Sequence, residues 1–145
     1  MGMYKGLEVQ IQMVRETSEK LGPSIKTPQT VWELLLDLRK KDREYFVVLC
    51  LDCKNRVLCI NTVSIGTLNA SMVHPREVFK PAILANSASI ILAHNHPSGD
   101  PGPSSSDKEI TKQIIAAGEI LNIPVLDHVI IGKDSWISLK IEKLM

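Results

Sequence analysis

The chain opens on a strict alternation of apolar and polar residues. Residues 7–13 (LEVQIQM) follow the period of a half-buried strand, whose side chains point by turns to opposite faces. Thr27 and Pro28 then supply a helix N-cap and a favoured first helical residue. Apolar residues recur at helical spacing from Val31 to Leu38, which predicts an amphipathic helix of about three turns.

Two apolar, β-branched runs follow in the middle of the chain. Residues 45–51 and 57–65 flank a short polar stretch in which Lys54-Asn55 favours a turn, so they predict a β-hairpin. His74-Pro75 then opens a second predicted helix, because proline is favoured at the first helical position.

The last third of the chain predicts a strand, a helix and a hairpin. Residues 88–93 (ASIILA) form a short apolar run typical of a buried strand. Ser104 is a candidate N-cap for a third helix, and residues 124–131 and 136–139 flank a Gly-containing turn as a final hairpin. Four residues of the third helix share its predicted inner face: Ile110, Ile114, Ala117 and Leu121.

This order of elements predicts the fold class. Strands interleaved with amphipathic helices indicate an α/β protein, an α-β-α sandwich in which the helices pack on a central mixed β-sheet. With 145 residues, 44% of them hydrophobic, the chain is expected to form a single domain over residues 1–145.

Composition narrows the possible partners. The 17 basic and 16 acidic residues give a net charge of +1, and a dedicated DNA-binding domain usually carries a basic surplus. DNA therefore stays a possible partner without support from charge. The N-terminal residues lack a secretory signal and no apolar run has the length of a membrane span, so we expect a cytoplasmic protein with no membrane partner.

The candidate chemistry follows the predicted strand at residues 88–93. His94 and His96 are one residue apart, so they point to the same side of an extended chain and can share one ion. Asp107, in the first turn of the next helix, can supply a carboxylate, and Asp100 in the intervening loop is its rival. Histidine and carboxylate ligands suit zinc and leave a fourth position for water, which predicts a hydrolytic zinc site.

The stretch HNHPSGDPGPSSSD, with His-x-His followed by Ser-x-x-Asp, resembles the JAMM signature of the MPN metalloprotease family. Within that family, the individual residues of this stretch resemble the RadC branch. Four further segments carry the same resemblance: residues 44–52 (EYFVVLCLD), 66–69 (GTLN), 73–79 (VHPREVF) and 126–132 (LDHVIIG). The resemblance implies a JAB/MPN-like fold, related to that of cytidine deaminases. It also implies that His94, His96 and Asp107 hold Zn²⁺. We expect residues 1–145 to hold this domain alone, without the helix-hairpin-helix region usually found ahead of it in the RadC branch.

Amide hydrolysis at such a site needs a base as well as a metal. The resemblance places the catalytic glutamate just before a strand, where Glu44 is the best match and Glu77 the rival. It also points the hydroxyl of Ser104 at the developing oxyanion. His74 and His128 are expected to be structural, with a supporting contact from His128 to a ligating histidine as the less favoured alternative, because such histidines usually donate their other N–H to a neighbour.

The resemblance therefore implies a zinc metallopeptidase that cleaves peptide or isopeptide bonds in a protein or peptide substrate. Two alternatives stay open at this point: a DNA-repair accessory protein that binds metal without protease activity, and a metal-dependent nuclease. The sequence makes no prediction about the oligomeric state.

Overall fold

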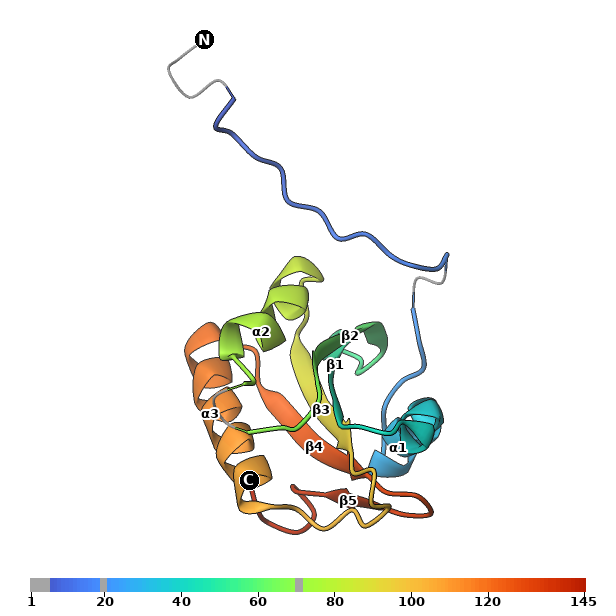
Figure 1. Ribbon diagram of the computed structural model, residues 1–145. Coiled ribbons are helices and arrows are strands. Elements are labelled where there is room, and N and C mark those ends of the chain that lie inside the picture. The colour runs from blue at the N-terminus through green and yellow to red at the C-terminus, as the bar shows by residue number, and fades with distance from the viewer. Residues whose placement is uncertain (1–5, 19–20, 70–71) are drawn as a thin grey trace.

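A five-stranded mixed sheet organises the fold (Figure 1). The computed structural model describes residues 6–18, 21–69 and 72–145. The strands are β1 (Tyr45–Leu51), β2 (Val57–Ile65), β3 (Ser89–Asn95), β4 (Val125–Ile131) and β5 (Trp136–Ser138). The helices are α1 (Pro28–Leu34), the 3-10 helix η1 (Leu36–Lys40), α2 (Pro75–Leu84) and α3 (Ser105–Leu121).

The sheet has the order β2-β1-β3-β4-β5, in which β3 and β4 are parallel and the other neighbours are antiparallel. The predicted hairpin of residues 45–51 and 57–65 is confirmed with these bounds. Its turn contains Asn55 at a φ of 59°, and Asp52 accepts hydrogen bonds from the backbone N–H groups of Lys54 and Arg56. A short aspartate side chain thus replaces the backbone partners that the turn removes.

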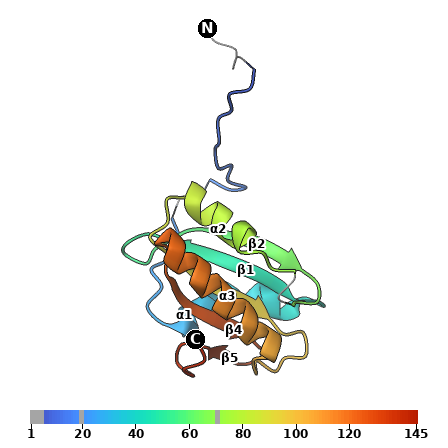
Figure 2. The same cartoon turned by 90° about the vertical axis from the view of Figure 1, so that its left-hand side faces the viewer.

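Alternation along the strands divides the core into two clusters, one on each face of the sheet. On β1, Phe46, Val48 and Cys50 face one cluster and the intervening residues face the other. Helices α2 and α3 cover the first face, and α1 with η1 covers the second (Figures 1 and 2). The predicted α-β-α sandwich with a central mixed sheet is therefore confirmed.

Two local predictions fail. Residues 6–7 form a turn and residues 8–13 belong to no strand of the sheet, so the predicted N-terminal strand is wrong. The helix predicted after Thr27 is split, because the α-helix ends at Leu34 and the chain continues as a 3-10 helix. Both parts still bury their apolar residues, since Val31, Leu35 and Leu38 pack on the second face. No helix in the described part of the chain is long and apolar enough to cross a membrane.

Helix α3 carries strong local signals at both ends. Ser104 is its N-cap and forms a capping box with Asp107, as the sequence predicts for the helix start. Asn122 ends it in the left-handed region, at a φ of 56°. Near this end Gly118 is buried where the chain turns back, and a Cβ built there would lie 2.5 Å from the backbone O of Ile123.

Replacing Gly118 with alanine tests that close approach. Helix propensity alone would make Gly118→Ala stabilising by up to about 1 kcal/mol. The clash with backbone that cannot move freely costs about 1–3 kcal/mol, so we expect a net loss in the free energy of unfolding. Urea denaturation measures it, and Ala116→Gly at an exposed position of the same helix gives the pure propensity effect, a loss of about 1 kcal/mol. Stabilisation by Gly118→Ala would contradict the tight packing.

Candidate metal centre

Two histidines converge at the C-terminal end of β3. His94 is fully buried and continues the face that α2 and α3 cover, since Ile90 and Leu92 on the same strand belong to that cluster. His96 lies just beyond the strand. Their Nε2 atoms are 3.0 Å apart, so both rings present one nitrogen to the same point.

Asp107 reaches this point from the first turn of α3. Its Oδ1 lies 3.2 Å from Nε2 of His94, and its Oδ2 lies 3.1 Å from Nε2 of His96. The capping box fixes the carboxylate, because the backbone N–H of Ser104 donates to Oδ2 while the hydroxyl of Ser104 accepts from the backbone N–H of Asp107. One local motif therefore starts the helix and aims its carboxylate at the histidines.

The spacing of these donor atoms fits one divalent ion. In a tetrahedral zinc site the ligand atoms lie about 2.0–2.2 Å from the metal, which puts neighbouring ligand atoms roughly 3.3–3.6 Å apart. The separations among His94, His96 and Asp107 are 3.0, 3.2 and 3.1 Å, slightly shorter than in such a site, so a small outward shift of the side chains would admit the ion. Glu44 also belongs to this cluster, since its carboxylate and the two imidazoles offer ligand atoms within 4.8 Å of one another. The structure brings the three predicted ligands together, and their binding of metal stays a prediction.

A buried chain of hydrogen bonds orients the ring of His94. Its Nδ1 lies 2.8 Å from Nε2 of His128, whose Nδ1 contacts the hydroxyl of Thr111. That hydroxyl donates to the backbone O of Asp107 at 2.7 Å, so it must accept from His128. His128 then carries its proton on Nδ1 and accepts from Nδ1–H of His94, which leaves Nε2 of His94 with a free lone pair toward the metal position.

The sequence interpretation preferred a structural role for His128 over this supporting one, and it did not single out Thr111. This contact depends on the pairing of two strands that lie far apart in the sequence. Positions 94 and 128 lie on the same face of two neighbouring parallel strands, and His94 pairs with Ile130 in the register of β3 and β4.

His96 is oriented by the loop that follows it. Its Nδ1 donates to the backbone O of Asp100 at 2.8 Å, which again leaves Nε2 as the acceptor that faces the metal position. The side chain of Asp100 accepts from the backbone N–H of Gly102 and so shapes the loop. The structure thus places Asp107, not Asp100, with its carboxylate against the two histidines.

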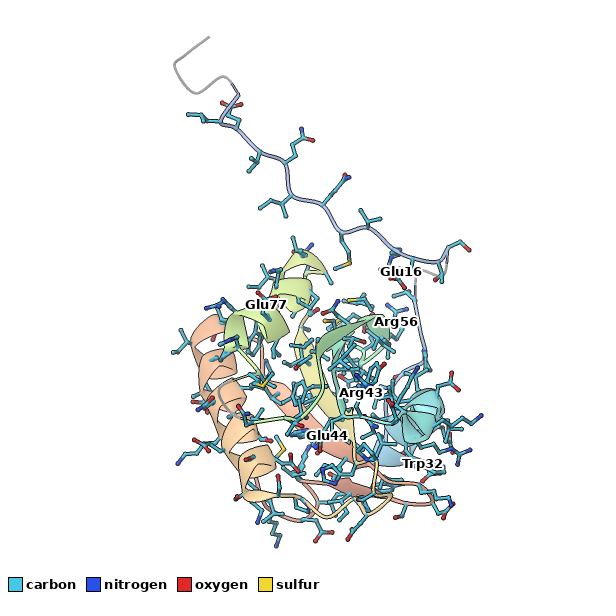
Figure 3. All side chains as sticks on the ribbon, in the orientation of Figure 1. Glu16, Trp32, Arg43, Glu44, Arg56 and Glu77 are labelled. Atoms are coloured by element: carbon cyan, nitrogen blue, oxygen red, sulfur yellow. The ribbon has the colours of Figure 1, made fainter. Side chains whose placement is uncertain are left out.

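Glu44 lies beside the three predicted ligands without joining them as closely. Its Oε1 is 4.0 Å from Nε2 of His96, and its Oε2 accepts from the backbone N–H of Leu68 at 2.9 Å. Figure 3 shows Glu44 at the start of β1, well away from Glu77 on α2. Glu77 instead pairs with Lys80 at 3.2 Å on the exposed side of its helix.

Asn95, between the two histidines in sequence, fixes the backbone on both sides of Glu44. Its Oδ1 accepts from the backbone N–H of Tyr45 at 2.7 Å, and its Nδ2 donates to the backbone O of Arg43 at 3.0 Å. Asn95 is fully buried, and the sequence interpretation assigned it no role. The tripeptide His94–His96, at the end of β3, therefore positions both imidazoles and the start of β1 beside Glu44.

The electrostatics of the cluster favour a charged carboxylate and a neutral His128. Burial alone would raise the pKa of Asp107, but hydrogen bonds to His94 and His96 outweigh it and hold this pKa well below its ordinary range. The hydrogen bond to Asp107 is also the main reason that the pKa of His96 is raised. Burial lowers the pKa of His128 far below its usual value, helped by the nearby His94.

Ser104 lies next to the cluster through its two hydrogen bonds with Asp107. It is exposed, and its Oγ acts as an acceptor in the capping box, which leaves its hydroxyl proton to donate elsewhere. Its place as the residue that starts α3 beside Asp107 is therefore compatible with the predicted contact to an oxyanion, and that contact stays a prediction.

Changing Thr111 tests the hydrogen-bond chain behind His94. Thr111→Val removes the hydroxyl that accepts the Nδ1 proton of His128, so His128 is free to carry its proton on Nε2 instead. His94 would then have to accept at Nδ1 and carry its own proton on Nε2, the nitrogen that faces the metal position. We expect zinc affinity to fall roughly 10–100-fold, measured by competition with a chromogenic chelator. Thr111→Ser keeps the hydroxyl and should bind zinc as the wild type does. Equal affinity in all three proteins would contradict the orienting role.

The raised pKa of His96 predicts that metal binding depends on pH. A protonated His96 pairs with Asp107 and has no lone pair for a metal, so the ion must displace that proton. Zinc affinity should therefore decrease by up to about tenfold per pH unit once the pH falls below this pKa. Titrations of the wild type over a series of pH values measure it. A flat profile through the range in which histidine titrates would show that His96 is not a ligand.

Comparison with known proteins agrees with this architecture. A family model described as the RadC-like JAB domain matches residues 25–144. A UPF0758 protein of Desulforudis audaxviator is 53% identical over 84% of this chain, and one of Desulforamulus reducens is 56% identical over 83%. A UPF0758 protein of Methanosarcina barkeri is 45% identical over 97% of this chain and 65% of its own length.

The chain spans about half the length of the first two relatives, 54% of each. The names of these relatives state no activity. The match of the family model covers every helix and strand of the structure, from α1 to β5, together with all the residues of the metal cluster. The chain belongs to the RadC-like JAB domain family.

Proposed function

We propose that this protein is a zinc-dependent hydrolase that cleaves peptide or isopeptide bonds. The observation that carries the proposal is the convergence of two imidazoles with fixed tautomers, one helix-borne carboxylate and a nearby glutamate at one point. When bound, zinc would act as a Lewis acid that lowers the pKa of a water molecule bound to it and polarises the carbonyl group of the substrate.

In this proposal, His94, His96 and Asp107 hold the metal, and Glu44 acts first as the general base and then as the general acid. Oε1 of Glu44 accepts a proton from the attacking water as the new C–O bond forms. Glu44 then returns this proton to the amine as the C–N bond breaks. Two features of the structure suit Glu44 to this work better than to metal binding: Leu68 holds its other oxygen, and its distance to His96, 4.0 Å, exceeds those of Asp107.

Ser104 is proposed to donate its hydroxyl proton to the oxygen of the attacked carbonyl. Such a donor acts where negative charge develops, and one donor of this type is worth roughly 3–4 kcal/mol. The support is its position at the start of α3, with the hydroxyl proton uncommitted in the capping box.

Metal analysis and a cleavage assay on matched variants test the proposal. The substrate probe is a defined mixture of peptides with ordinary and lysine ε-linked bonds, with products read by mass spectrometry. The zinc-loaded wild type should bind one ion and cleave, whereas the double variant His94→Ala, His96→Ala should do neither. Glu44→Gln should keep its zinc and lose roughly 100–10,000-fold in rate. Glu77→Gln is the matched control and should behave as the wild type.

Each outcome bears on a different part of the proposal. Equal zinc content in the wild type and the double histidine variant would remove the metal site. Loss of zinc in Glu44→Gln would make Glu44 a ligand instead of the base. A zinc-loaded wild type that cleaves neither kind of bond would overturn the peptidase assignment, and zinc-dependent cleavage of plasmid DNA in the same preparation would replace it with a nuclease.

A further inference from the structure

Two of the three cysteines lie opposite one another across the hairpin of β1 and β2. Cys50 pairs with Cys59 in the antiparallel register of these strands, and all three cysteines are free thiols. Residues directly opposite in an antiparallel pair point to the same face of the sheet. Both side chains accordingly belong to the cluster under α2 and α3, with Cys50 buried in it and Cys59 packed against it.

The geometry of this pair suits a disulfide bond. The Cα atoms of directly opposite residues in antiparallel strands are about 4.5–5.5 Å apart. A disulfide requires Cα atoms about 4.4–6.8 Å apart and side chains that point toward one another. The two thiols already interact, because a hydrogen bond with Cys59 is the main reason that the pKa of Cys50 is raised. The bond can therefore form without a change in the pairing of the strands.

The surroundings of the two thiols give them different reactivity. Cys50 is fully buried, and its burial also raises the pKa of its thiol. Cys59 is only partly buried and lines a groove of about 920 Å³ beside β2. The hydrogen bond with Cys50 and the positive charge of Arg15 lower the pKa of Cys59, although burial opposes them. Arg15 is held there by a hydrogen bond of 2.7 Å from its guanidinium to the backbone O of Leu58. Cys59 therefore supplies the thiolate, which is the nucleophilic form.

We propose that Cys50 and Cys59 are a site of reversible oxidation, at which a hydroperoxide converts the two thiols into a cross-strand disulfide. The thiolate of Cys59 attacks one oxygen of the peroxide, so that an S–O bond forms, the O–O bond breaks and hydroxide leaves. Cys59 is then a sulfenic acid. The sulfur of Cys50 attacks that of Cys59, the S–O bond breaks, and the departing hydroxide takes the proton of Cys50 to become water.

The overall reaction is balanced with the peroxide as the oxidant. Two thiols and one molecule of hydrogen peroxide give one disulfide and two molecules of water, so the sulfur atoms are oxidised and the peroxide oxygens are reduced. A partly exposed thiolate next to a second thiol is the arrangement typical of cysteines that are oxidised reversibly. This inference concerns a modification of the sheet and is independent of the proposed hydrolase activity.

Cys53 is the other partner that the sequence offers to Cys50. It lies three residues later, in the turn between the strands, and its side chain is exposed. The side chain of Cys50 instead points into the core under α2 and α3. A bond between Cys50 and Cys53 would require Cys50 to leave that core, whereas a bond to Cys59 keeps both residues in register.

Peptide mapping of the full chain after exposure to hydrogen peroxide tests the proposal. The reduced protein is treated with peroxide, unfolded, blocked with N-ethylmaleimide and digested with trypsin without reduction. Lys54 and Arg56 lie between Cys50 and Cys59, so trypsin separates these cysteines unless a disulfide joins them. The wild type should give the joined peptides, and dithiothreitol should release them. Cys53→Ser is the matched control and should form the same bond.

Two alanine variants separate the roles of the two thiols. In Cys50→Ala the second thiol is missing, so the sulfenic acid of Cys59 should accumulate and react with dimedone. In Cys59→Ala the first thiol is missing, and Cys50 should react with peroxide at least about tenfold more slowly than Cys59 does in Cys50→Ala. Mapping of the wild type requires no substitution, so the result for the bond itself does not depend on the folding of these variants.

Several results would overturn the proposal. One is a wild type in which Cys50 and Cys59 both stay free after peroxide treatment, and another is a bond between Cys50 and Cys53. Oxidation of Cys59 to a sulfinic acid without the disulfide would also do so, because that modification is not reversed by a thiol. Equal reaction rates of the remaining thiols in Cys50→Ala and Cys59→Ala would contradict the assignment of Cys59 as the attacking thiol.

Discussion

Asp107 is the residue on which the site depends, because it belongs to two hydrogen-bonding systems at once. As the partner of Ser104 in a capping box, its side chain helps to start α3. The same carboxylate lies 3.1–3.2 Å from both imidazoles, where it keeps its charge despite burial. An ionised carboxylate without such partners would be costly at this depth, so the helix start and the histidine pair stabilise one another.

Behind this carboxylate, the buried side chains of His94, His128 and Thr111 form a connected chain of hydrogen bonds. His94, His128 and Thr111 each give or accept one proton in sequence, and the chain ends on the backbone O of Asp107. A network of this kind is stable only when every member is satisfied, and it then allows a single arrangement of protons. The rigidity that follows is useful for a metal site, since the ligand nitrogens are already directed before an ion arrives.

The polar groups that support the site lie on one face of the sheet and at one of its ends. The face under α2 and α3 carries His94 and His128, and the stacked ring of Phe46 packs against His94 from β1. The strand start at Glu44 is tied to Asn95 on one side and to the loop at Leu68 on the other. Three segments that are distant in the sequence therefore meet at one end of the sheet, the end at which β3 delivers both histidines.

The sequence by itself determined the elements whose signals are local. The hairpin, the proline start of α2 and the capping box of α3 follow from neighbouring residues, and His94, His96 and Asp107 could be chosen because one strand, one loop and one helix turn connect them. Only the tertiary structure decided the partners that orient these groups. His128 lies 34 residues from His94, Asn95 lies 50 from Tyr45, and Leu68 lies 24 from Glu44. Such contacts depend on strand order and register, and these are set by the packing of the whole sheet. The N-terminal alternation shows the converse, because residues 7–13 have the pattern of a strand and yet pair with no strand of the described structure.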